Sequence, residues 1–271
     1  MATLPNPLPR LATDPSGRSL GLSLPPGRLV DTTDDGPWHE PLLWHAEKPA
    51  APGTWKALGV PASRAGLLPV LVDAGAHGGG PAGWELAPGL MSYPGDHDAE
   101  DVLAEYWEDW AEEGAGEELA PFGAAWPGLA PAATATAGPD TRAAQVSDTL
   151  TGAAPEWFRG PRLALVPARR SADIPAAIGW TGPLNHDEDV ARLCAVLRSW
   201  EDRFGVRVVG LGFDVLVVSV AAPPTETTVA KALAAEHFAF CPDAVTEDGP
   251  GSVGDYAKGL LNSPTWSFRW D

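Results

Sequence analysis

The sequence has few basic residues. Its 271 residues include 18 Lys and Arg against 36 Asp and Glu, for a formal net charge of −18. A protein that binds DNA or RNA needs clustered Lys and Arg to neutralise phosphates and release counterions, whereas here the basic residues form only short pairs such as Arg169–Arg170. The composition therefore argues against nucleic-acid binding, and it favours a basic protein partner that is attracted electrostatically.

Cysteine and long apolar segments are also scarce. The two cysteines, Cys194 and Cys241, are too few for a disulfide framework, and each precedes or follows apolar residues that predict burial as a reduced thiol. The first twenty residues contain no apolar segment of signal-peptide length, and no segment approaches the roughly 18–20 apolar residues of a membrane span. We therefore expect no membrane association and a cytoplasmic location.

Motifs for metal, cofactor and nucleophile sites are missing from the sequence. There is no H-E-x-x-H, no paired C-x-x-C and no G-x-S-x-G. The pair Gly210-x-Gly212 lacks the third glycine of a dinucleotide fingerprint and precedes an apparent strand, which favours a hairpin turn. These absences predict no metal and no cofactor, and they favour a non-enzymatic function over an enzymatic one.

Acidic residues, by contrast, are abundant and unevenly placed. Residues 1–160 hold 22 acids and 8 bases (net −14), and residues 161–271 hold 14 acids and 10 bases (net −4). Eleven acids and no Lys or Arg occur between Asp96 and Glu118, on a segment whose apolar residues recur at helical spacing. The pattern predicts an acidic amphipathic helix over residues 98–113. Its outer side is either a solvated helix face or a docking surface for a basic partner, formed by Glu105, Glu108, Asp109, Glu112 and Glu113.

The remaining periodicity predicts an α+β protein, with a mostly antiparallel sheet, helices packed on one face, and two halves forming one compact unit. Residues 1–130 form an N-terminal α+β region and residues 156–271 a C-terminal α+β domain. Between them, residues 131–155 are small, polar and interrupted by proline, which predicts a linker or an extended surface strap. In the C-terminal part, 207–211 and 213–220 are expected to pair as a hairpin, and 266–270 to form an edge strand.

The segment "NHDEDVARLCAVLRSWEDRFG" (185–205) combines polar residues with a core-facing apolar stripe. Asn185 and Glu188 have the spacing of a capping box, and the acids around them suit the positive end of a helix. Helix capping therefore accounts for most of the cluster. His186 is the exception, because beside Asp187 it has the chemistry of a proton shuttle or of one metal ligand, although a zinc site needs three or four convergent ligands.

Tryptophan is frequent, with 12 in the chain. Most should be core residues, but an exposed tryptophan often anchors a binding interface. The candidates are Trp180, ahead of the polar loop, and Trp266 and Trp270 near the C-terminus. Asp214, in the expected turn of the hairpin, is a further candidate for lining a pocket with Asn185, His186 and Asp187.

Several of these motifs together resemble a known family. They are Gly179-Trp180, Asn185-His186-Asp187, Arg198-Ser199-Trp200-Glu201, Phe213-Asp214, "HFAFCPD" from His237 to Asp243, and the terminal Trp-x-Phe-x-Trp-Asp. Over about residues 162–271 the chain resembles a bacterial, mainly actinobacterial, domain-of-unknown-function family, number four thousand two hundred and fifty-three. The resemblance implies no particular activity.

Three functional hypotheses follow. The first is a non-enzymatic interaction module, antitoxin-like or immunity-like, that binds a basic protein; this rests on analogy with other small acidic proteins. The second is a small-ligand or enzymatic domain with a pocket around Trp180, Asn185, His186 and Asp187. The third is a structural component of a larger assembly.

Overall fold

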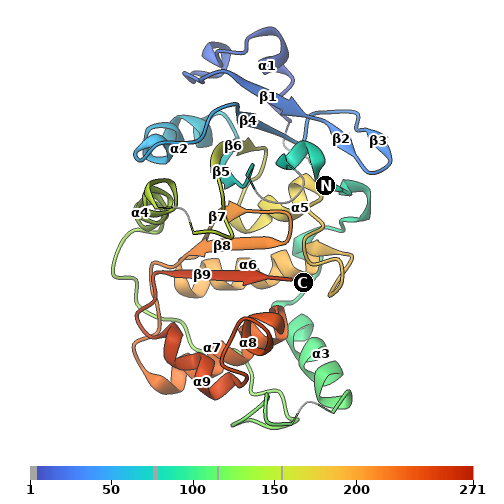
Figure 1. Ribbon diagram of the computed structural model, residues 1–271, viewed down its shortest axis with the longest axis vertical. Coiled ribbons are helices and arrows are strands. Elements are labelled where there is room, and N and C mark those ends of the chain that lie inside the picture. The colour runs from blue at the N-terminus through green and yellow to red at the C-terminus, as the bar shows by residue number, and fades with distance from the viewer. Residues whose placement is uncertain (1–4, 76–78, 115, 154, 271) are drawn as a thin grey trace.

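The computed structural model describes residues 5–75, 79–114, 116–153 and 155–270. Its centre is a seven-stranded sheet with the order β1-β4-β6-β5-β7-β8-β9, beside which lies the small β2–β3 pair (Figure 1). The strands are β1 Gly27–Val30, β2 Thr32–Thr33, β3 Gly36–Pro37, β4 Leu43–Ala46, β5 Leu68–Val72, β6 Arg162–Val166, β7 Arg207–Leu211, β8 Val215–Ser219 and β9 Thr265–Arg269.

Neighbouring strands of the large sheet run antiparallel, apart from the parallel pair β5–β7, in which Leu71 lies opposite Gly210. The α+β class and the compact union of both halves are confirmed, because β5 from the first half lies between β6 and β7 from the second. The expected hairpin of β7 and β8 is present, and β9 is the expected edge strand.

Helices cover both faces of the sheet. They are α1 Arg10–Thr13, α2 Thr54–Arg64, α3 Ala99–Glu112, α4 Pro139–Gly152, α5 Ile174–Ile178, α6 Val190–Phe204, α7 Thr227–Phe240, α8 Asp243–Thr246 and α9 Val253–Leu260. Among the described residues, none of these helices is long and apolar enough to span a bilayer.

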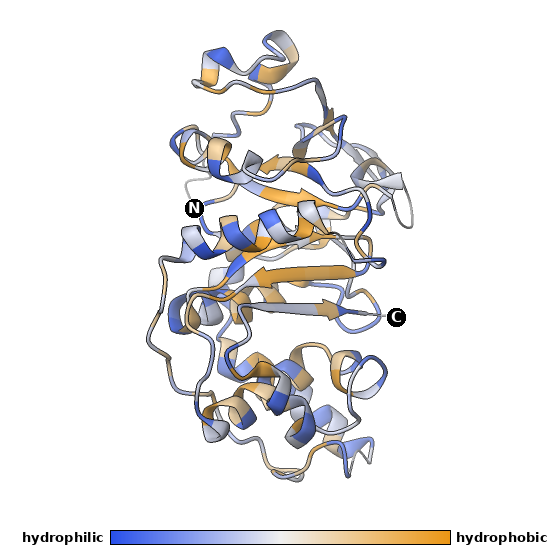
Figure 2. Cartoon of the chain, turned by 60° about the vertical axis from the view of Figure 1, so that its left-hand side comes forward, coloured by the Kyte–Doolittle hydropathy of each residue, from blue (hydrophilic) through white to orange (hydrophobic). Residues whose placement is uncertain are grey.

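Alternating side chains of the strands enter hydrophobic clusters on both faces of the sheet, and the central strands are hydrophobic along their length (Figure 2). On one face, residues such as Val208 and Leu216 pack with α6, and α7 continues this core toward α3. On the other face, Leu71, Val209 and Val217 pack against α2 and α4. The expectation of helices packed on one face describes α6 and α7. Helices α2 and α4 form a second layer on the opposite face, which the sequence analysis did not predict.

Part of the expected linker is a helix. Residues 139–152 form α4, with Pro139 in the first turn, where the missing N–H of proline is harmless. Ala143, Val146 and Leu150 of α4 are buried against the sheet. The preceding residues do run along the surface, since the N–H groups of Ala133 and Thr136 donate to the carbonyls of Arg203 and Ala221. The domain boundaries themselves stay a prediction.

The start of α6 differs from the expected capping box. The N-cap is Asp189, whose carboxylate accepts from the N–H of Ala191 at 3.1 Å. Asn185 and Glu188 lie ahead of the helix, in a turn in which His186 and Asp187 donate their N–H groups to the carbonyl of Pro183. The box fails because this turn, and not a helical turn, satisfies the main chain there. At the other end Gly205 closes α6 with φ 62°, as expected for a glycine after a helix.

Candidate functional site

The acidic helix α3 forms as expected, from Ala99 to Glu112. Asp98 caps it, because its carboxylate accepts from the N–H groups of Glu100 at 2.9 Å and Asp101 at 3.2 Å. The acids of this first turn also meet the positive end of the helix dipole. The local sequence therefore accounts for where the helix begins.

The two sides of α3 have opposite character. Val102, Leu103, Tyr106 and Trp107 are buried, and the ring of Trp107 makes an edge contact with Phe238 of α7 at 5.7 Å between centroids. The opposite side carries five exposed carboxylates, which we call the acidic face: Glu105, Glu108, Asp109, Glu112 and Glu113.

Polar side chains near the start of α6 hold α3 in place. The hydroxyl of Tyr106 donates a hydrogen bond to the carboxylate of Asp187. Arg192 donates to the same carboxylate at 3.0 Å, pairs with Glu105 at 2.8 Å, and lies over the ring of Tyr106 at 5.0 Å from its centroid. Burial, followed by the bond to Asp187, raises the pKa of Tyr106, so the phenol remains protonated and keeps donating.

A second set of hydrogen bonds connects the segment before α3 to the start of α6. Besides capping α6, Asp189 accepts from the N–H of Ser92 at 3.0 Å. The Ser92 hydroxyl in turn lies 2.6 Å from Nε2 of His97, which is 3.8 Å from Asp189. The acids around the start of α6 therefore do two jobs: they begin one helix and anchor another.

His186 lies half-buried at the junction of α3, α6 and α7. Its ring is 4.5 Å from that of Tyr106, and its Nε2 is buried without a hydrogen-bond partner among the described residues. Burial lowers the pKa of His186 and so favours the neutral ring, although the nearby charge of Asp187 acts in the opposite direction. Within the described ranges, no three His, Cys, Asp or Glu side chains are grouped to hold a metal ion.

The other candidate residues surround the turn between β7 and β8. Trp180 is 1% exposed and donates its indole N–H to the carbonyls of Gly212 at 2.8 Å and Phe213 at 3.1 Å. Its ring makes an edge contact with the ring of Trp270, whose main-chain N–H donates to the carbonyl of Asp214. The Asp214 side chain lies 3.8 Å from the guanidinium of Arg269. Trp180 thus stabilises the turn of the β7–β8 hairpin by hydrogen bonds made from within the core.

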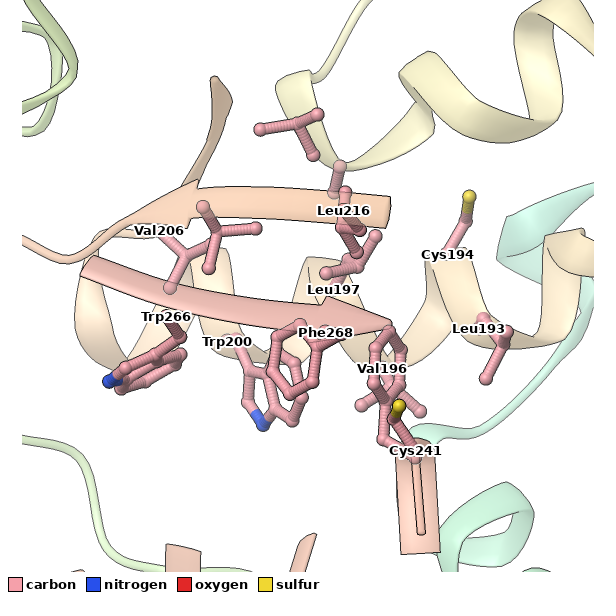
Figure 3. Close-up of a cluster of buried hydrophobic side chains, with 14 of the residues drawn as sticks. Leu193, Cys194, Val196, Leu197, Trp200, Val206, Leu216, Cys241, Trp266 and Phe268 are labelled. Atoms are coloured by element: carbon pink, nitrogen blue, oxygen red, sulfur yellow. The ribbon is translucent and has the colours of Figure 1, made fainter. Parts of the chain in front are cut away.

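Trp266 is also a core residue, 3% exposed. Figure 3 shows it beside Trp200 of α6 and Phe268 of β9, and the rings of Trp200 and Phe268 stack at 5.5 Å. The structure therefore brings His186 and Asp187 to α3, and Trp180, Asp214 and Trp270 to the hairpin. Asn185 is exposed in the loop between these groups.

Two cavities lie elsewhere on the described surface. One, of about 560 Å³, lies between β9 and α9 and includes Trp266 in its lining. The other, of about 600 Å³, lies between α2 and α4 and ends at Arg170 and Arg207. These arginines are paired: Arg170 lies 2.6 Å from Asp202, and Arg207 lies 3.3 Å from Glu201. No sequence motif indicated either cavity, since each is formed by residues far apart in the chain.

Comparison with known proteins bears on the second half of the chain. Residues 162–271, from β6 to the last residue, match the model of a family described as "Domain of unknown function (DUF4253)". The resemblance to a domain-of-unknown-function family is thus confirmed for this segment, and its actinobacterial character stays a prediction. No curated protein and no solved structure matches the chain.

Proposed function

We propose that the protein is an interaction module that binds the basic surface of a partner protein through the acidic face of α3. The observation that supports this most is that basic residues are almost absent around these five carboxylates. All are exposed, and α3 carries no Lys or Arg. Among the described residues, Glu105 is the only member of the acidic face that forms an ion pair, and its partner is Arg192. A compact field of one sign is left for a partner to neutralise.

The position of Glu112 and Glu113 supports the proposal on energetic grounds. They lie in the last turn and at the C-cap of α3, where the helix dipole is negative and basic residues are favoured. Carboxylates there weaken the helix. Natural proteins keep such unfavourable groups where function requires them, so the charge on this turn is better explained by binding than by folding.

The anchoring of α3 supports it on geometric grounds. The buried stripe, the Tyr106–Asp187 bond and the Arg192–Glu105 pair fix the rotation and position of the helix on α6 and α7. Neighbouring carboxylates of the face are thereby held about one helical turn apart, roughly 5.4 Å along the axis, which is less than the roughly 8–10 Å over which salt screens charges. A preorganised field speeds encounter with an oppositely charged surface.

A quadruple variant tests the proposal: Glu108→Gln, Asp109→Asn, Glu112→Gln and Glu113→Gln. Glu105 is kept because it pairs with Arg192. The matched control makes the same change of charge at exposed acids far from α3 in the sequence: Asp34→Asn, Asp35→Asn, Glu40→Gln and Glu47→Gln.

Wild type and both variants are immobilised and exposed to a lysate of the cells that carry the gene, at low and high salt, and the retained proteins are quantified by mass spectrometry. We expect basic proteins that bind wild type and the control at low salt and are lost from the α3 variant. For a retained protein made recombinantly, the association rate with the α3 variant should fall by about tenfold or more at low salt. Equal retention by the two variants would contradict the proposal.

A further inference from the structure

The cavity between β9 and α9 contains one of the two edges of the sheet, that of β9. β9 pairs with β8 on one side only, and all five of its residues line the cavity. Figure 1 shows β9 at the edge of the sheet, next to α7, α8 and α9. An edge strand with accessible main-chain groups is a template for one more strand.

The pairing register shows which main-chain groups face the cavity. Val220 donates its N–H to the carbonyl of Pro264, and Trp270 donates to that of Asp214, which marks 264 and 270 as hydrogen-bonded positions toward β8. Because these positions alternate along an antiparallel strand, 266 and 268 also bond to β8. The N–H and C=O groups of Thr265, Ser267 and Arg269 therefore point away from β8.

The two ends of this free edge are already occupied. The hydroxyl of Ser263 donates to the carbonyl of Thr265 at 2.7 Å, and the thiol of Cys241 donates to that of Arg269 at 3.1 Å. Between them lies Ser267, which is exposed, and nothing in the described part of the chain bonds to its N–H or C=O on the free side. One residue of an added strand can exchange both of its hydrogen bonds with Ser267.

The cavity also has two walls for the side chains of such a strand, which alternate between its faces. One wall includes Trp157, an aromatic side chain that is 41% exposed. The other is α9, with Tyr256 and Gly259. At Gly259 an added Cβ would meet nothing within 4 Å, so this wall is open there and has room for a partner's side chain.

Charge selects the kind of occupant. The charged groups of the lining are Asp248, Asp255 and Arg269; Arg269 lies 3.8 Å from Asp214, and Asp255 pairs with Lys258 at the surface. The lining is thus net acidic, on a chain of net charge −18. A second copy would bring another −18 to the same contact, whereas a basic segment is attracted.

We propose that this groove binds an extended, basic segment of another protein, which adds a strand to β9 by pairing with Ser267. This site is separate from the acidic face of α3 and does not depend on it.

Four variants of the full-length chain test the proposal. Ser267→Pro removes the outward N–H and leaves the bonds to β8, since proline is tolerated on edge strands where the N–H faces outward. Ser267→Ala removes the hydroxyl alone and is its control. Gly259→Trp fills the open wall, and Gly259→Ala is the control for adding a side chain to the helix.

The probe is a phage-displayed library of random dodecapeptides selected on the wild-type chain. We expect enrichment of peptides with Lys or Arg next to β-branched residues. Their affinity should fall by about tenfold or more in Ser267→Pro and Gly259→Trp, and stay within about twofold in the two Ala variants and in the quadruple α3 variant. Hydrogen exchange should show new protection of the Ser267 amide in the peptide complex.

Three results would overturn the proposal. The library yields no peptide above background; the selected peptides bind Ser267→Pro and Gly259→Trp as tightly as wild type; or light scattering shows a wild-type dimer that Ser267→Pro converts to a monomer, which assigns the edge to a second copy. Should Ser267→Pro fail to fold, Gly259→Trp and the exchange of the Ser267 amide decide the matter. Peptides lost only from the α3 variant are a case of the second result, and they would assign the binding to the acidic face.

Discussion

Tyr106 and Asp187 are 81 residues apart in the sequence, yet the hydroxyl of one donates to the carboxylate of the other. The bond joins the buried side of the acidic helix α3 to the residues that precede α6. Arg192 completes the group by binding Asp187 and covering the ring of Tyr106. The orientation of the acidic face therefore depends on a contact made on the opposite side of the same helix.

A double-mutant cycle measures this contact. Tyr106→Phe and Asp187→Ala should each destabilise the protein, and the coupling between them should be about 1–3 kcal/mol, as expected for a largely buried hydrogen bond to a charged group. The free energies of unfolding are obtained from urea titrations of wild type, both single variants and the double variant. A control cycle pairs Tyr106→Phe with Glu108→Ala on the exposed side and should be additive. Coupling near zero in the first cycle would mean that the bond does not hold α3.

The elements that could be predicted from the sequence are those defined by short-range patterns. The apolar spacing within α3 and α6 and the alternation Trp266, Phe268, Trp270 predicted two helices and an edge strand, because burial of one face requires that periodicity. Helix α4 was missed because two of its four buried residues, Ala143 and Ser147, are small, in a segment rich in Thr and Ala. With only Val146 and Leu150 as larger apolar residues, the helical period is weak.

The partners of the candidate residues could not be predicted for a different reason. The sequence identified Asp187 as unusual, but Tyr106 and Arg192 had no local feature that linked them to it. Trp180, Trp266 and Trp270 were candidates for an exposed interface, and each is at most 4% exposed. Tryptophan serves in cores and in interfaces through the same large apolar area, so residue type alone does not distinguish the two. The groove beside β9 depends on a sheet edge, which exists only after folding.

The last turn of α3 should show opposite effects on stability and binding. Replacing Glu112 and Glu113 together by Lys puts cations at the negative end of the helix and should raise the unfolding temperature by roughly 1–4 °C at low salt. The same replacement of Glu100 and Asp101 in the first turn should lower it. Thermal unfolding followed by circular dichroism separates these cases. If the acidic face binds a basic partner, the stabilised variant is also the one that loses binding. A fall in unfolding temperature for both pairs would show that the helix dipole does not govern this end.

A buried carboxylate holds the chain immediately before the expected strap (131–155). Glu236 of α7 is 0% exposed and accepts from the N–H of Ala130 at 2.7 Å, the indole of Trp200 at 2.7 Å and both terminal nitrogens of Arg203 at 2.8 and 2.5 Å. Glu236→Ala leaves a largely buried guanidinium and two further donors without their acceptor. We expect a loss of about 3–5 kcal/mol in the free energy of unfolding, with faster hydrogen exchange at the Ala130 amide. A loss below about 1 kcal/mol would show that water replaces the carboxylate.

The stability of the protein should fall as the pH is lowered from neutrality, and His237 should account for part of the fall. This residue is fully buried, with Nδ1 3.2 Å from the hydroxyl of Tyr256 and rings of Trp266 and Phe268 against it. Burial, with a smaller effect of Arg203, lowers its pKa to about 3 from the ordinary 6.5. A depressed pKa means that the unfolded chain takes up a proton that the folded chain refuses, so stability is full above pH 6.5 and decreases as the pH falls toward 3.

The expected slope from His237 is roughly 1 kcal/mol per pH unit between about pH 6 and 4. Burial also lowers the pKa of His45 and His186, so part of the dependence persists when His237 is replaced. His237→Phe keeps an aromatic ring in the cluster and removes the titrating group. Urea titrations at pH 7.5, 6.0 and 5.0 should give a shallower decline for this variant than for wild type, whatever their difference at pH 7.5. Parallel declines would mean that the His237 imidazole gains its proton in the folded chain as readily as in the unfolded one, which is incompatible with its burial among Trp200, Trp266 and Phe268.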